Sequence, residues 1–237
     1  MLCIRSFFGI LSTSNRARTV FPCWDEPEIY MNYEIVIRHF EQYQVISNMP
    51  VQKLLHESNN MSLTYFHISK PITSSQVAII MLDNMIQHTL EDEYLWCKLH
   101  ITVEETNILN EIYYIKRNLT TNFKVEDRIM KTDHIVIPNF PLQVIGSLGV
   151  IIYREHSIKF DTNTDFPGRK INIYKFIGDA MAREVLGQVI CPSYQWLIKI
   201  LASFLSHFTI FQVSLRSYLC QNIVTFLQVT HFILLYC

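Results

Sequence analysis

Cysteine and histidine are the residues of this chain that could bind a transition metal or form a redox pair, and their spacing argues against both uses. The closest two of the six cysteines, Cys220 and Cys237, are far apart in the sequence, so the C-x-x-C pair of zinc knuckles and redox dithiols is absent. The closest two of the nine histidines are His56 and His67, so no two histidines can lie one turn apart on a helix. We therefore expect no local two-histidine metal site, and the cysteines are too sparse for a disulfide scaffold.

A pair of opposite charges on one helix is the next arrangement that could do chemistry. The segment 176–190 has one apolar face, which predicts an amphipathic helix. Asp179 and Arg183 lie on the other side, one helical turn apart with the acid first, so we expect a solvent-exposed ion pair worth about 0.3–0.5 kcal/mol. By itself this helix pattern indicates no catalytic or binding function. Its apolar face consists of Ile177, Met181, Val185 and Val189, with Ala182, Leu186 and Ile190 beside them.

The elements that would position these side chains change character along the chain. Alternating or continuous apolar runs bounded by polar residues predict strands in the first part, with a turn at 47–50. The acidic stretch at 104–106 marks a change in composition, which we interpret as a domain boundary, and the second part mixes helix and strand. The expected strands are 34–38, 45–46, 76–83, 94–103, 134–137 and 149–153, and a helix is expected at 107–118.

The charge balance excludes one class of partner. The chain has 20 Lys and Arg against 21 Asp and Glu, a net charge of −1, so no basic field exists that could hold a phosphate backbone. We therefore expect no nucleic-acid partner.

Charged residues almost vanish near the C-terminus, where Arg216 is the only one between positions 200 and 237. The segment 217–237 is long enough to cross a bilayer as a helix, although several polar side chains interrupt the run. The alternatives are a buried helix or set of strands, or a segment that never belonged to a folded domain.

At the N-terminal end of the chain, the apolar block 7–11 is shorter than a signal-peptide core, so the N-terminus predicts no secretion signal.

Residues 17–27 (A-R-T-V-F-P-C-W-D-E-P) resemble the A-R-x-x-F-P-C-x-D-E-P signature of the aminopeptidase N family, the zinc-dependent gluzincin metalloaminopeptidases. Residues 47–50 (S-N-M-P) are similar to the S-N-M-P of that family, and residues 65–83 to a strand-rich stretch that follows it. Residues 133–141 and 149–155 are similar to the segments that flank its substrate-binding motif. These five matches occur in the family's order along most of the chain, which makes chance similarity a poor explanation.

The resemblance implies an α+β chain with a partial saddle-like β-sandwich N-terminal domain, followed by the truncated start of a thermolysin-like catalytic domain. In family members the motif at 17–27 lies well inside the β domain, so we expect the strands that precede it to be missing here. The expected divisions are a partial aminopeptidase N-like β domain at 1–103, a truncated thermolysin-like peptidase domain at 104–208, and an apolar tail of unassigned structure at 209–237.

The resemblance also places the family's zinc helix, H-E-x-x-H-x-W-x-G-x-x-x-x-P, on this chain. Gly187 and Pro192 match its G and its P. In that register Asp179 and Arg183 stand where the two histidine ligands would be, and Ala180 stands where the general-base glutamate would be.

Two further functional positions follow from the same comparison. The glutamate that is the family's third zinc ligand falls on Ala202, close to Phe204, which matches a family phenylalanine. The family's G-A-M-E-N motif, whose glutamate binds the substrate's free amino group, falls on residues 143–147. Its glutamate is replaced by Gly146 and its asparagine by Ser147.

These replacements imply a chain without catalytic residues, metal ligands or a substrate-binding carboxylate. Zinc needs three protein ligands, and peptide hydrolysis at zinc also needs a carboxylate that accepts a proton. We therefore expect no cofactor in this chain, although zinc is the cofactor of the family.

Three interpretations remain open for the function. The chain is an inactive relative or fragment of an enzyme that removes N-terminal residues from peptides, a non-catalytic module that binds a peptide or protein, or an aminopeptidase with atypical zinc ligands. Family analogy favours an extracellular or plasma-membrane location, which the weak N-terminal signal does not support. Membrane association would come either from 217–237 or by that analogy.

Overall fold

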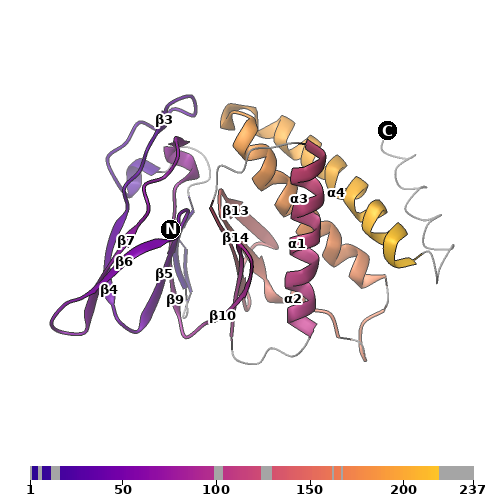
Figure 1. Ribbon diagram of the computed structural model, residues 1–237, viewed down its shortest axis with the longest axis horizontal. Helices are drawn as coiled ribbons and strands as arrows, with labels where there is room; N and C mark the ends of the chain where they lie inside the picture. The colour runs from indigo at the N-terminus through magenta and orange to yellow at the C-terminus, as the bar shows by residue number, and fades with distance from the viewer. Residues whose placement is uncertain are drawn as a thin grey trace.

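The computed structural model is built of layers, with small β-sheets in the N-terminal half, a five-stranded sheet in the middle and helices on its far side (Figure 1). Helices and sheets are combined in one chain, which confirms the expected α+β class. The structure describes residues 2–4, 7–11, 17–98, 104–123, 130–161, 163–166 and 168–218.

The described N-terminal half forms three antiparallel sheets. A four-stranded sheet has the order β1-β2-β9-β5, a three-stranded sheet the order β4-β7-β6, and β3 pairs with β8. The bounds of these strands are β1 Leu2–Ile4, β2 Phe7–Leu11, β3 Tyr30–Met31, β4 Val36–Phe40, β5 Tyr43–Ser47, β6 Val51–His56, β7 Met61–Phe66, β8 Ile72–Thr73 and β9 Ala78–Asp83, with short 3₁₀ turns η1 Ala17–Thr19 and η2 Ser74–Gln76.

The five-stranded sheet has the order β10-β11-β12-β14-β13. Its central strand β12 is parallel to both neighbours, and the outer strands β10 and β13 are antiparallel. This sheet contains strands from both sides of the domain boundary expected between residues 103 and 104. Strands β10 and β11 precede that boundary, and β12, β13 and β14 follow it. The strand bounds are β10 Ile86–Leu90, β11 Glu93–Cys97, β12 Thr132–Ile137, β13 Val144–Ser147 and β14 Val150–Arg154.

The helices cover one face of the five-stranded sheet (Figure 1). Helix α1 begins at Glu104, where the composition changes, and connects β11 to β12. Helix α3 buries Ile177, Met181 and Val185 as its periodicity predicts, whereas Val189 is exposed because the helix ends there. The helix bounds are α1 Glu104–Phe123, α2 Glu155–Ile158, α3 Arg169–Val189 and α4 Gln195–Tyr218, with a 3₁₀ turn η3 Pro192–Tyr194 before α4.

Strand β12 is buried along its whole length because both faces of its sheet are covered. Its side chains alternate, so that Val136 joins the core under the helices while Ile135 and Ile137 join the core against the four-stranded sheet. The second core is completed from the N-terminal half by residues such as Ile46 and Ile80. The two halves of the described chain are thus joined by an apolar sheet-to-sheet interface.

Asn48 adds a polar connection between the same halves. Its side chain is buried, and its Nδ2 donates to the carbonyl of Gln76 at 2.9 Å and to that of Leu148 at 2.6 Å. Its Oδ1 accepts the backbone N–H of Ala78 at 2.8 Å. This asparagine belongs to the S-N-M-P segment, so one sequence motif fixes the distance between β9 and the hairpin of β13 and β14.

Helix α4 presents an apolar stripe to the surface. Trp196, Ile200 and Phe204, each one turn after the last, are 62%, 60% and 63% exposed.

Within the described part of the chain, no helix is both long and apolar enough to cross a membrane. Residues 219–237, nearly all of the segment considered above as a membrane span, lie outside the described residues.

Replacing Asn48 should weaken the whole fold. Asn48→Ala leaves the Ala78 N–H and two carbonyls buried without their partner, and each such group costs about 1–3 kcal/mol. We expect the free energy of unfolding, measured by urea denaturation, to fall by at least about 2 kcal/mol. Asn32→Ala, at an exposed asparagine, is the matched control and should change it by less than about 0.5 kcal/mol. Equal losses in the two variants would contradict the assigned role of Asn48.

Candidate functional site

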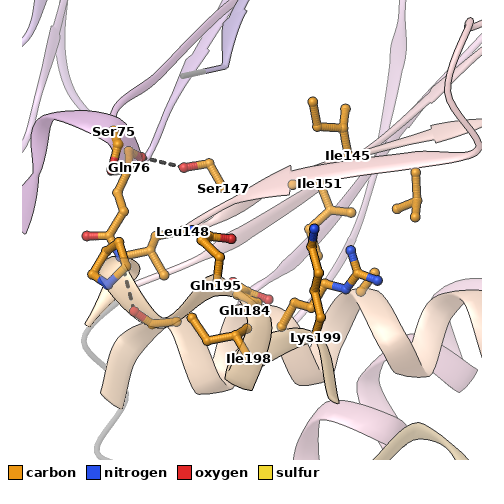
Figure 2. A pocket seen from close by; sticks show the side chains of 16 residues that line it. Ser75, Gln76, Ile145, Ser147, Leu148, Ile151, Glu184, Gln195, Ile198 and Lys199 are labelled. Carbon is orange, nitrogen blue, oxygen red and sulfur yellow. Dashed lines mark hydrogen bonds between the residues drawn. The ribbon is translucent and has the colours of Figure 1, made fainter. Parts of the chain in front are cut away.

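A pocket of about 450 Å³ lies between strand β13 and helices α3 and α4. Figure 2 shows Ile145 and Ser147 on the strand side, and Glu184, Gln195, Ile198 and Lys199 on the helix side. A volume of this size suits a small molecule or a few residues of a peptide. The lining residues are Ser75, Gln76, Val144, Ile145, Gly146, Ser147, Leu148, Ile151, Ala180, Arg183, Glu184, Gly187, Pro192, Gln195, Ile198 and Lys199.

One end of the pocket is closed by hydrogen bonds that converge on Gln76. The hydroxyl of Ser147 donates to the Gln76 carbonyl, and the Gln76 side chain donates through Nε2 to the carbonyl of Gly187 at 3.1 Å. Gly187 stands near the end of α3, so this one glutamine joins η2, β13 and α3. The hairpin that carries Ser147 turns at Gly149, whose φ of 75° favours glycine. These bonds hold the strand wall at a fixed distance from the helix wall.

Strand β13 forms the edge of its sheet, and half of its backbone groups point away from β14. The Arg154 N–H donates to the Gln143 carbonyl at 2.9 Å, which makes that pair a hydrogen-bonded one in the antiparallel ladder. Because hydrogen-bonded pairs alternate along such a ladder, the N–H and C=O groups of Val144 and Gly146 point to the open side. Both residues line the pocket, so an extended ligand could pair with them.

The two positions aligned with the substrate-binding motif, Gly146 and Ser147, lie together in the strand wall. A Cβ atom on Gly146 would meet Ile151 Cγ1 at 3.3 Å, which is tight, and the Val150 carbonyl oxygen at 3.5 Å, which is an ordinary contact distance. The structure therefore places Gly146, the position aligned with the family's glutamate, in the wall of the pocket, where only its backbone borders the space.

The positions aligned with the zinc helix do not assemble a set of metal ligands. Arg183 Nη2 lies 2.6 Å from Asp179 Oδ2, so the predicted ion pair forms. The Asp179 side chain is only 18% exposed, less than expected, and burial raises its pKa despite the opposing Arg183 charge. Ala180 and Arg183 line the pocket, and Ala202 on α4 is buried. Over the described residues, no three His, Cys, Asp or Glu side chains lie close enough together to hold a metal ion.

Behind the helix wall lies a network of buried ionisable side chains that the sequence did not reveal. Lys116 on α1 lies 2.6 Å from Glu93 Oε1 and donates to the Thr132 hydroxyl at 2.7 Å. Thr132 in turn donates to Glu184 Oε1 at 2.8 Å, and His134 contacts the other oxygen of Glu93 at 2.8 Å. All five side chains are buried, so the network joins α1, β11, β12 and α3 inside the core.

The two glutamates of this network have opposite pKa shifts. Burial opposes the ionisation of Glu93, but the His134 hydrogen bond and the Lys116 charge together lower its pKa. Burial is the main reason that the pKa of Glu184 is raised, and Lys116 only partly offsets it. Glu184 Oε2 has no hydrogen-bond partner among the described residues. Glu93 is thus the carboxylate that the network stabilises as an anion.

Three pocket residues, Glu184, Lys199 and Gln76, were not predicted from the sequence. Glu184 follows Arg183 directly and lies one helical turn after Ala180, so the period of the helix could have placed it on the same side as Ala180. Lys199 and Gln76 belong to separate elements, and no local pattern links them to α3.

Comparison with known protein families finds a match in the N-terminal part of the chain. A family model described as Peptidase M1 N-terminal domain matches residues 12–75, which include the motif at 17–27.

Similarity to whole proteins extends further along the chain. It is 26% identical over 195 residues to a glutamyl aminopeptidase of Bitis rhinoceros, covering 79% of this chain and 20% of that protein. It is 26% identical over 184 residues to endoplasmic reticulum aminopeptidase 2 of Bos taurus, covering 73% of this chain and 19% of that protein. It is 24% identical over 237 residues to aminopeptidase Q of Mus musculus, covering 92% of this chain and 41% of that protein. The chain is a relative of the M1 aminopeptidases, and it spans about a fifth of the length of the first two proteins.

The two buried glutamates should respond differently to the loss of their charge. Glu93→Gln removes the carboxylate that neutralises Lys116 and contacts His134, so we expect the free energy of unfolding at pH 7 to fall by about 3–5 kcal/mol. Glu184→Gln keeps an acceptor for Thr132 and leaves Lys116 paired with Glu93, so it should change stability by less than about 1.5 kcal/mol. Urea denaturation of both variants measures the difference. A larger loss in Glu184→Gln would contradict the assigned hierarchy.

Proposed function

We propose that this relative of the M1 aminopeptidases binds no catalytic zinc on α3 and cleaves no peptide. The observation that carries the proposal is the Asp179–Arg183 ion pair at 2.6 Å. Asp179 is the only one of the positions aligned with zinc ligands that has a metal-binding side chain. Its oxygen is already engaged by a guanidinium, whose positive charge opposes the approach of a cation.

The remaining aligned positions support the same proposal. Ala180 offers no carboxylate to accept a proton from water, and Ala202 offers no third ligand. Glu184 is the carboxylate nearest to Ala180 along the helix face, but its Oε1 accepts hydrogen bonds from Thr132 and from the Gly149 N–H. Neither a zinc ion nor a base in the family's arrangement fits these residues.

We also propose a second function, peptide binding without catalysis, which the pocket and the open edge of β13 favour. An extended peptide can add to an exposed sheet edge through its main chain, and neighbouring pockets then select its side chains. Val144 and Gly146 supply the outward backbone groups, and the pocket beside them has room for side chains. In this proposal Ala180 and Arg183 form part of the peptide-binding wall.

The activities of the relatives come to this chain only as proposals, because it spans about a fifth of the length of the glutamyl aminopeptidase. One relative is named as an endoplasmic reticulum aminopeptidase. By analogy we propose that this chain acts in the secretory pathway or at the cell surface.

The proposed absence of zinc catalysis can be measured directly. We expect purified chain to contain far less than one zinc per molecule and to hydrolyse an alanine-arylamide substrate no faster than Arg183→Ala, because the aligned ligands and base are absent. Metal analysis after dialysis against zinc, together with initial rates, makes the test. Stoichiometric zinc with turnover above that of the Arg183→Ala variant would refute the proposal.

Peptide binding at β13 can be tested through the backbone N–H of Gly146. Gly146→Pro removes this outward N–H, and proline is tolerated where a strand edge is open. Gly146→Ala keeps the N–H and is the matched control, with one close Cβ contact at 3.3 Å. In fluorescence anisotropy with a labelled, acetylated peptide, we expect about tenfold weaker binding in the proline variant alone. Equal binding by both variants would exclude pairing along this edge.

A further inference from the structure

Three ionisable side chains line the pocket: Arg183 and Glu184 from α3, and Lys199 from α4. Figure 2 shows Lys199 extending from the helix side toward Ile151, and Glu184 on the helix side near Gln195. These side chains differ in burial and in ion pairing, and the differences predict the charge of the ligand that the pocket would bind.

Glu184 is turned toward the protein interior. It is 4% exposed, and its Oε1 accepts hydrogen bonds from the Thr132 hydroxyl and the Gly149 N–H. Its Oε2 has no hydrogen-bond partner among the described residues, and a buried polar atom in that state normally marks a missing donor. Because this oxygen is inaccessible to solvent, the Glu184 carboxylate offers a ligand in the pocket no free acceptor.

The two cations in the pocket lining, Arg183 and Lys199, are both exposed. The Arg183 side chain is 45% exposed, and its charge is partly neutralised by the ion pair with Asp179. Lys199 is exposed, and its charge is not neutralised by any ion pair found within the described part of the chain. Among the described residues that line the pocket, Glu184 is the only acidic one. The free charge that a ligand would meet on entering is thus positive.

We infer that the pocket selects peptides through a carboxylate, which pairs with Lys199 and Arg183 in the pocket lining. This inference rests on the proposed peptide-binding function and specifies its ligand. It reverses the charge preference expected of a zinc site, because an anion now occupies the side of the pocket where aligned positions would have held a cation. Either a C-terminal carboxylate or an acidic side chain supplies the required group.

Binding of four acetylated peptides tests the inference and distinguishes the two sources of carboxylate. The first pair is Ala-Ala-Ala with a free C-terminal acid or with a C-terminal amide. The second pair is amidated Ala-Glu-Ala or amidated Ala-Gln-Ala. We expect at least one anionic peptide to bind about tenfold more tightly than its neutral partner, as a charged hydrogen bond in a partly enclosed site allows. Raising the salt concentration should shrink that ratio.

The variant Lys199→Gln shows whether the preference arises in this pocket. It should abolish the anionic preference, whereas Lys199→Arg should keep it. Lys53→Gln is the matched control, because Lys53 is an exposed lysine on β6 outside the pocket lining. An unchanged preference in Lys199→Gln, or equal binding of anionic and neutral peptides, overturns the inference but leaves peptide binding intact. If no peptide binds to any variant, the proposed peptide-binding function fails with it.

Discussion

The pairing of Lys116 with Glu93 is the constraint on which the helix layer depends. An ammonium group buried at 7% exposure is tolerable only while a carboxylate stays beside it, so α1 and β11 must keep their relative position. Lys116 also donates to the Thr132 hydroxyl, which in turn donates to Glu184, a residue of the pocket wall. The shape of the pocket therefore depends partly on charges that lie inside the core.

Local patterns in the sequence predicted helix α3 and the strands β12 and β14, but not β13 or α4, which form the other two walls of the pocket. The apolar period of α3 and the runs that became β12 and β14 follow from burial alone, because a helix with one buried face and a covered strand each leave a distinct spacing. Alignment to the family motifs predicted residues of the pocket. The register fixed at Gly187 selected Ala180 and Arg183, and the structure places both in one pocket with Gly146.

The remaining features arise from contacts that no local pattern records. Lysine and glutamate are normally exposed, so nothing in the spacing of Lys116, Glu93 and Glu184 indicates that they meet in the core. Lys199 enters the pocket because the chain reverses between α3 and α4, and Asn48 reaches the distant Leu148. The sheet of β10 to β14 likewise joins strands from both sides of the composition change at 104, because pairing depends on the chain returning rather than on composition.

The open edge of β13 has a consequence for the behaviour of the protein in concentrated solution. Unpaired backbone groups at the end of a sheet attract strands of other molecules, and natural proteins commonly protect such edges with charged side chains. Gly146 occupies the position where the family resemblance places a glutamate, so this edge strand has no charged side chain there. The absence of a charged side chain at this position leaves the edge of β13 open to pairing with strands of other molecules.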